Sequence, residues 1–309
     1  MTKETAMPTH ARSIATHGRP TGDIVEAVRR LCYPDVRELD QNRVYALRQY
    51  VAIVTLAHHA GARRILELGG GISTAMWARL GAATGAEVIC VDASFDRMWT
   101  HVESMPERDL IRERVRLVEA GTVSAEQLRS FYGVEGHGSI GAVRIADLAP
   151  LMDAWISERC PWPMWRAACE LAAPGPPSVA RLLVQDGSLV FPRALLDRYA
   201  LGGSLDANLD FLERLDREGR GDALASIVER EEPFDLVFFD GGELSTLLEW
   251  ETLRGRIRPG GLAAFHDVFY PKSMKSFIAC AAVEADPDWR TIYVDDSTMQ
   301  GMVVAQRLR

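Results

Sequence analysis

The sequence lacks the features that mark secreted, membrane-spanning and fibrous proteins. No apolar run approaches the roughly 18 residues that a membrane-spanning helix needs. Residues 1–20 mix Thr, His and Arg without an apolar stretch, which predicts a mobile tail and argues against a signal peptide. The five cysteines form no C-x-x-C pair, and an odd number is no disulfide framework. We therefore expect reduced thiols and a cytoplasmic location.

Internal repeats, low-complexity segments and an excess of positive charge are also missing. With 35 basic against 43 acidic residues, the formal net charge is −8. This charge argues against a surface that tracks phosphates over the whole protein, so we expect neither a nucleic-acid nor a membrane partner. The 309 residues, 47% hydrophobic, can bury a sizeable core without disulfide or metal staples.

Short apolar strands alternate with helices in two parts of the chain. Their hydrophobic interiors suit a parallel sheet that is covered on both faces. In the first part we predict a helix over 40–60, strands over 64–68, 87–92 and 115–119, a helix capped by Ser73 or Thr74 and ending near Ala83, and a helix over 95–114. In the second part we predict strands over 234–240, 262–265, 290–294 and 299–306, with helices over 245–257 and 272–285.

The segment between these two parts breaks the alternation. Residues 124–231 are predicted to be mostly helical, with helices over 205–218 and 222–231 and a small hairpin over 181–191 that turns at Asp186-Gly187. We predict one doubly wound domain, 55–123 and 232–309, preceded by a helical cover over 21–54. The insertion 124–231 would serve as a lid, a substrate-binding unit or an oligomerisation unit.

A glycine cluster follows the first predicted strand. Glycines in Glu67-Leu68-Gly69-Gly70-Gly71 allow positive φ and let a ligand approach the backbone closely. The next helix offers free amide donors to an anionic group. Asp92 ends the next strand, 21 residues past Gly71, where an acidic side chain suits a ribose diol. Together these features predict a nucleoside-containing cofactor.

At these residues the sequence resembles the class I S-adenosylmethionine-dependent methyltransferases. Further matches are Ala120-Gly121-Thr122, the strand 234–240, the turn 258–262 and the last strand 298–305. The resemblance implies an α/β fold, a doubly wound, seven-stranded Rossmann-like sheet of order 3-2-1-4-5-7-6 with the last strand antiparallel. It implies that S-adenosylmethionine is bound by Glu67, Gly69, Gly70, Gly71, Ser73, Thr74, Asp92, Ala93, Gly121, Thr122 and Asp240.

A narrower likeness joins Asp240-Gly241-Gly242-Glu243 with Phe265-His266-Asp267-Val268. These residues look like the macrocin O-methyltransferase and cephalosporin-hydroxylase-like branch, although many members have D-G-D-H at the first site. The likeness implies a divalent cation, Mg²⁺, held by Asp240 and Asp267 beside the acceptor hydroxyl. We take Asp240, His266 and Glu243 as candidate catalytic residues.

Methyl transfer to an alcohol or phenol benefits from a base or a cation that lowers the pKa of the acceptor. Two alternatives stay open, because Asp240 and Asp267 also suit strand-end caps without a metal, and His266 suits either a base or a structural histidine. Lys272 and Lys275 are expected on a solvated helix face, with Lys272 near enough in sequence to reach the site. The remaining candidates for substrate contact are Tyr132, His137, Trp155, Trp162 and Trp165, of which the tryptophans equally suit a helical core.

The leading hypothesis is therefore methyl transfer to a small-molecule hydroxyl, of the kind found in natural-product biosynthesis, by a possible homodimer. One alternative keeps the cofactor but transfers an aminocarboxypropyl group or cyclises, releasing methylthioadenosine. An NAD-dependent oxidoreductase is disfavoured because no G-x-G-x-x-G run follows the strand. A non-catalytic nucleoside-binding protein is the remaining alternative.

Overall fold

The computed structural model describes the regular part of the chain. No helix among the described residues is long and apolar enough to cross a bilayer. The described residues are 41–103, 105–132, 137–138, 184–185, 188–190, 205–242, 244–268, 275–295 and 301–309.

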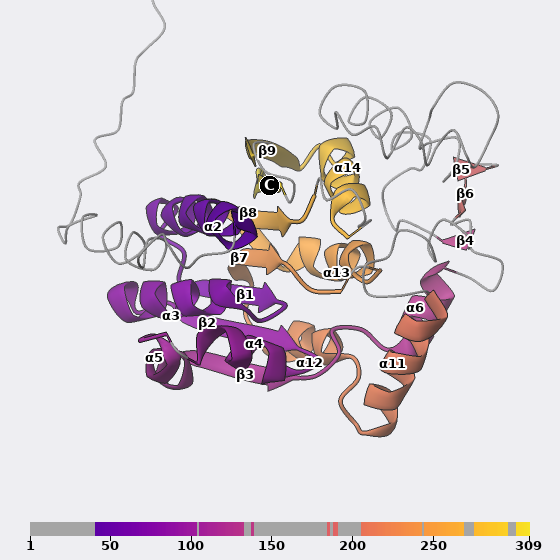
Figure 1. The fold of residues 1–309 in the computed structure, drawn as a ribbon. Helices are drawn as coiled ribbons and strands as arrows, with labels where there is room; N and C mark the ends of the chain where they lie inside the picture. Colours follow the sequence, from indigo (N-terminus) through magenta and orange to yellow (C-terminus); the bar gives the residue numbers. More distant parts are fainter. Residues whose placement is uncertain are drawn as a thin grey trace, which may run out of the picture.

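A seven-stranded sheet forms the centre of the molecule (Figure 1). Its order is β3-β2-β1-β7-β8-β10-β9, which is 3-2-1-4-5-7-6 when these strands are numbered along the chain. β10 pairs antiparallel with both β8 and β9, whereas the other pairs are parallel. The predicted fold class, strand order and reversed strand are thus confirmed. The strands are β1 (Arg64–Leu68), β2 (Glu87–Asp92), β3 (Val115–Glu119), β7 (Phe234–Phe239), β8 (Ile257–His266), β9 (Trp289–Asp295) and β10 (Met302–Arg307).

Helices cover both faces of this sheet because its strands alternate apolar side chains between two cores. In β7, Val237 and Phe239 point into one core and Leu236 and Phe238 into the other. The second core is covered by α2 (Gln41–His59), α3 (Ile72–Thr84), α4 (Phe95–Val102) and α5 (Arg108–Arg114). The first is covered by α6 (Ala125–Tyr132), α11 (Leu205–Arg217), α12 (Ala223–Arg230), α13 (Thr246–Leu253) and α14 (Phe277–Ala285).

Several predicted element boundaries are wrong, three of them for reasons that the structure shows. The helix predicted over 95–114 divides into α4 and α5, because Pro106 in the intervening turn cannot continue an α-helix. α3 begins at Ile72 with Gly71 as N-cap, and Ser73 and Thr74 lie inside its first turn, where their hydroxyls donate to Glu67. β8 begins at Ile257 and contains Pro259 in an exposed stretch beside a register shift, where a missing backbone donor is tolerated.

The insertion contributes more than helices. β4 (His137–Gly138), β5 (Val184–Gln185) and β6 (Ser188–Val190) form a small sheet of order β4-β6-β5. β5 and β6 pair antiparallel, which confirms the predicted hairpin, although its turn at Asp186-Gly187 lies outside the described residues. The predicted helices near 205 and 222 are confirmed as α11 and α12. Their apolar side chains complete the first core, so the end of the insertion is part of the main domain.

Several predictions concern residues outside the described part of the chain. The tail 1–20, most of the helical cover 21–54, and Trp155, Trp162 and Trp165 belong to this group. α2 begins inside the cover and extends past residue 54, so the predicted boundary at 54–55 falls within a helix. Cys90 and Cys280, the cysteines that the structure describes, are buried free thiols. This agrees with the expected reduced state for these two residues.

Candidate active site

The loop after β1 lies against the end of β7, at the point where the strand order reverses. Gly69 has φ +97°, and a Cβ there would come within 2.3 Å of the Asp240 carbonyl oxygen. Only glycine therefore lets the two strand ends approach this closely. Beside it, a Cβ on Gly71 would meet nothing within 4 Å. The loop is thus closed toward Asp240 and open at the start of α3, where the carboxyl edge of a doubly wound sheet binds ligands.

The Glu67 side chain fixes the start of α3, next to this loop, through two hydrogen bonds. Its side chain is fully buried in β1, and its two carboxylate oxygens accept hydrogen bonds from Ser73 Oγ at 2.5 Å and Thr74 Oγ1 at 2.7 Å. Burial outweighs these hydrogen bonds and raises the pKa of Glu67 to about 7. The same Thr74 hydroxyl accepts from the Gly71 amide at 3.0 Å. Among the residues predicted to bind the cofactor, these three polar side chains bind one another and fix the loop.

Asp92 ends β2 beside the same loop. Its Oδ2 accepts from the Gly70 amide at 2.7 Å and its Oδ1 from the Ser94 amide at 2.9 Å. Burial raises the pKa of Asp92, against the lowering effect of the Ser94 and Gly70 hydrogen bonds. Each carboxylate oxygen has a second lone pair, so the side chain can still accept from a ligand hydroxyl. Ala93, the next residue, is half-buried and packs on the first core.

The loop after β3 is fixed from two sides. Gly121 donates its amide to the Arg220 carbonyl at 2.7 Å, and the Thr122 carbonyl accepts from the Leu224 amide at 3.1 Å. The Thr122 hydroxyl donates to Glu249 Oε1 at 2.5 Å. Glu249, which is fully buried on α13, was missed by sequence reasoning, because an acidic residue in the first turn of a helix is usually a surface group.

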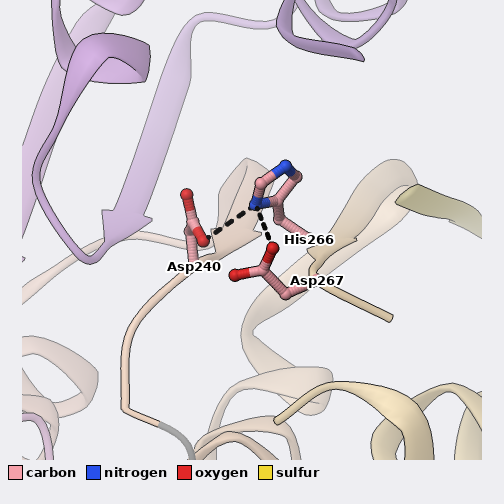
Figure 2. A group of neighbouring side chains, drawn as sticks. All are labelled: Asp240, His266 and Asp267. Carbon is pink, nitrogen blue, oxygen red and sulfur yellow. Dashed lines mark hydrogen bonds and ion pairs between the residues drawn. The ribbon is translucent and has the colours of Figure 1, made fainter. Parts of the chain in front are cut away.

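Four charged side chains meet where β7 and β8 end. His266 Nδ1 lies 3.1 Å from Asp240 Oδ1 and 3.4 Å from Asp267 Oδ1 (Figure 2). The Lys275 ammonium lies 2.5 Å from Asp240 Oδ1 and 3.0 Å from Asp267 Oδ2. We call Asp240, His266, Asp267 and Lys275 the charge quartet. Lys275 is only 7% exposed, so the prediction of a solvated helix face is wrong for this residue.

The quartet stabilises the charged form of each member. Burial opposes ionisation throughout, but the carboxylates of Asp267 and Asp240 outweigh it and raise the pKa of His266 to about 10. The same carboxylates overcome burial and raise the pKa of Lys275. In return, Lys275 and His266 outweigh burial and lower the pKa of both Asp240 and Asp267. At neutral pH the quartet therefore contains two anions and two cations.

The backbone at Asp267 adopts a left-handed conformation within the quartet. Asp267 has φ 56°, a conformation that a residue with a side chain seldom adopts. Such strain persists where the surroundings enforce it, often at functional sites. Ser276 contributes by donating its hydroxyl to the His266 carbonyl at 2.7 Å, which ties the start of α14 to the end of β8.

α2 supplies two further residues that sequence reasoning missed. The buried Gln49 places Oε1 3.0 Å from His266 Nε2, and the Tyr50 hydroxyl donates to Asp240 Oδ2 at 3.4 Å. Both ring nitrogens of His266 are therefore hydrogen-bonded, as the structural-histidine alternative requires. No motif marks Gln49 or Tyr50, since both lie in a helix far from the strand ends in sequence.

Three members of the quartet have the composition of a metal site, but the Lys275 side chain occupies the space between the two carboxylates. Asp240, His266 and Asp267 each offer one ligand atom, and these atoms lie within 4.8 Å of one another. The Lys275 ammonium, however, lies between the two carboxylates. A ligating histidine nitrogen must be unprotonated, whereas His266 Nδ1 faces two carboxylate oxygens as a donor. As these side chains stand, they do not fit a bound divalent cation.

The other predicted site residues are placed as follows. Glu243 lies outside the described residues, and so does Lys272. Tyr132 ends α6, and His137 pairs with Val190 in the small sheet. In Figure 1 the parallel strands of the main sheet point toward the side where α6, α11 and the small sheet lie. The two residues thus lie in elements on the carboxyl side of the sheet, and their contact with a substrate stays a prediction.

Comparison with known proteins gives similarity at the level of structure. No family model matches the sequence, and no curated protein matches it either. The structure is similar to an O-methyltransferase from Bacillus cereus in complex with SAH, with 16% identity, 93% of this chain and 92% of that chain covered, and a TM-score of 0.42. It is also similar to the O-methyltransferase TomG from Streptomyces achromogenes, involved in tomaymycin synthesis and in complex with SAM, with 14% identity, 94% and 92% covered, and a TM-score of 0.42. The fold assignment itself rests on the strand order of this chain.

Proposed function

We propose that this protein is a class I S-adenosylmethionine-dependent methyltransferase that methylates a hydroxyl group of a small molecule. One observation carries the proposal: the glycine loop after β1 touches Asp240, and Asp240 belongs to the charge quartet. A nucleoside-binding loop and a group of ionised side chains therefore share one edge of the sheet. The sequence resemblance described above supports the same reading.

The loops after β1 and β2 have space and hydrogen-bond acceptors that suit S-adenosylmethionine. The open side of Gly71 leaves room at the start of α3, and the Asp92 carboxylate stands ready to accept from ribose hydroxyls. When bound, S-adenosylmethionine supplies an electrophilic methyl group on a sulfonium. The loops would position it close to Asp240, which follows β7 and lies against the glycine loop. The binding roles of the predicted residues stay part of this proposal.

The quartet supports an oxygen acceptor. A hydroxyl is a poor nucleophile, and a nearby positive charge favours its ionised form. His266 keeps its proton between two carboxylates, so it acts as a fixed charge and not as the base. The catalytic role of Glu243 stays a prediction, and so do the small-molecule partner and a homodimer.

Calorimetric titration with S-adenosylmethionine and S-adenosylhomocysteine tests the proposal. We expect one binding site per chain, with affinity at least about 10-fold lower in Asp92→Asn, because a charge-assisted hydrogen bond contributes about 1.5–3 kcal/mol. Asp109→Asn is the matched control, since its carboxylate is 84% exposed on α5. Absence of binding by the folded wild-type protein would refute the proposal.

Product analysis then identifies the transferred group. Incubation with a panel of phenols and alcohols should release S-adenosylhomocysteine and a methylated product. Release of methylthioadenosine would instead favour aminocarboxypropyl transfer or cyclisation.

A further inference from the structure

The Lys275 side chain stands at the position that a metal ion would take between Asp240 and Asp267. Its Nζ lies 2.5 Å from Asp240 Oδ1 and 3.0 Å from Asp267 Oδ2, and the residue is 7% exposed. Mg²⁺ requires oxygen ligands at about 2.0–2.1 Å in near-ideal octahedral geometry. An ion bridging these two oxygens would occupy the space that the ammonium fills.

The two carboxylates have no unused oxygen facing the quartet. Oδ1 of Asp240 accepts from both His266 and Lys275, and its Oδ2 accepts from the Tyr50 hydroxyl. In Asp267, Oδ1 faces His266 Nδ1 and Oδ2 accepts from Lys275. Each of the four oxygens thus has a donor within 3.4 Å. A metal that bridged Asp240 Oδ1 and Asp267 Oδ2 would have to displace the Lys275 ammonium from both.

Charge balance points the same way. The Lys275 ammonium lies against both carboxylates and already places a positive charge between them. A divalent cation added between the carboxylates would meet this ammonium within a few ångströms, and such repulsion is strong where the site is buried. Without the ammonium, the two carboxylates would attract a cation without this opposing charge.

The presence of a lysine at position 275, and not an arginine, supports the same conclusion. The chain has only three lysines, at 3, 272 and 275, among 35 basic residues. An ammonium is a compact point charge, whereas the guanidinium used elsewhere in this chain is a broad planar fork. The buried position between two carboxylates thus has the basic side chain whose charged group is closest in size to a metal ion.

We propose that the Lys275 ammonium takes the place of a divalent cation, so that this site works without a metal. The ammonium holds the two strand-end carboxylates together and presents a fixed positive charge at the carboxyl edge of the sheet. Its effect on an acceptor hydroxyl, lowering the pKa of that group, rests on the proposed function. The occupancy of the cation position does not, and it can be measured without cofactor or acceptor.

Electron paramagnetic resonance with Mn²⁺ as the probe tests the occupancy directly. We expect wild-type protein to leave millimolar Mn²⁺ in its free hydrated form, and Asp267→Asn to behave in the same way. Lys275→Met removes the ammonium but keeps the aliphatic stem. This variant should bind one Mn²⁺ per chain, at least about 10-fold more tightly than the wild type, and Lys275→Met/Asp267→Asn should lose that binding.

Arg112→Met is the control for losing a positive charge, because its half-exposed guanidinium pairs only loosely, at 3.6 Å, with Asp109. It should leave Mn²⁺ binding at the wild-type level. One Mn²⁺ bound per wild-type chain and lost in Asp267→Asn would overturn the proposal, as would a folded Lys275→Met that binds none. Should Lys275→Met fail to fold, the comparison of wild type with Asp267→Asn still decides. A protein that binds S-adenosylmethionine and Mn²⁺ together would contradict this inference but not the proposed function.

Discussion

Gly69 shows how much one residue determines about the candidate site. A Cβ at this position would lie 2.3 Å from the Asp240 carbonyl oxygen, and φ +97° is unfavourable for any residue with a Cβ. The glycine therefore sets the distance between the loop that would hold the cofactor and the residue that would face the acceptor.

Gly69→Ala should consequently damage both stability and binding. We expect the free energy of unfolding to fall by about 1–3 kcal/mol, the usual cost of strain or overpacking, and the affinity for S-adenosylhomocysteine to fall with it. Chemical denaturation and calorimetry measure the two effects. Gly255→Ala is the matched control, since its Cβ would meet nothing within 4 Å. Equal behaviour of the two variants would contradict this account of the loop.

The raised pKa of Glu67 predicts that the free energy of unfolding decreases as pH rises, the opposite of the usual effect of a carboxylate. Its pKa is raised to about 7 in the fold, whereas the unfolded chain has the ordinary value near 4.5. Between these values the folded state keeps a proton that the unfolded state has released, so stability decreases as pH rises through this range. A shift of this size corresponds to at most about 3 kcal/mol.

Denaturation measured from pH 4.5 to 7 should show this loss in the wild type. In Glu67→Gln the corresponding decrease should be absent, because the amide does not titrate. An unchanged slope in Glu67→Gln would assign the effect to another group.

At the residue scale the sequence identified the strand-end acids and missed their partners. Asp92 and Asp240 end predicted strands and Asp267 lies two residues past another, so the topology of parallel strands places them. Gln49 enters the site from α2 and Lys275 from the turn before α14, and nothing local in the sequence tells that these side chains meet the strand ends. Their contacts depend on tertiary packing, which a single sequence does not display.

α2 links the beginning of the described chain to the candidate site. Ile53, Val54 and Ala57 are buried in the second core, and one turn earlier Gln49 reaches His266. The helix thus positions its polar side chain through its apolar anchors.

Ile53→Ala should weaken this anchoring. Loss of a fully buried aliphatic side chain costs about 2–5 kcal/mol, the range seen when a core cavity is created. Thermal or chemical unfolding measures the change. His59→Ala, at an exposed position of the same helix, should stay within about 0.5 kcal/mol of the wild type. If both variants unfold alike, α2 does not depend on this core.

At the element scale, the first three strands were predicted to the residue, whereas β8 begins five residues before its predicted start and β10 three residues after. β1, β2 and β3 have the predicted bounds because each is a short run with a hydrophobic interior. Helix boundaries moved at two places: Thr74 lies inside the first turn of α3, where its hydroxyl donates to Glu67 and accepts from the Gly71 amide, and Pro106 interrupts a polar helical stretch. Competing local contacts of this kind are resolved only by the surrounding fold.

On the scale of the whole molecule, the insertion and the core cannot be separated cleanly. Leu212, Leu215, Leu224 and Ile227 of the insertion are all buried in the first core. At about 1.5–3 kcal/mol each, they contribute on the order of 10 kcal/mol, comparable with the net stability of a typical domain.

Replacing residues 124–231 with a short flexible linker should therefore prevent folding. We expect loss of the near-ultraviolet circular dichroism signal and of cofactor binding. A folded, cofactor-binding product would show that the doubly wound core is complete without α11 and α12. The strand order was predictable because the motifs occur along the chain in the order typical of the family that the sequence resembles. The core shared by the insertion and the sheet was not predictable, since apolar positions alone do not reveal which residues they pack against.

The small sheet beside the carboxyl edge has a consequence for evolution. β6 pairs with both β4 and β5, so the two ends of the stretch between residues 138 and 184 are tied to the same strand. Closing a longer loop costs little, about 0.6 kcal/mol for each doubling of its length. Such a stem lets the intervening stretch be lengthened, shortened or exchanged while the catalytic scaffold stays intact. Under the proposed function, acceptor preference would diversify as an exchangeable module on a constant cofactor-binding core.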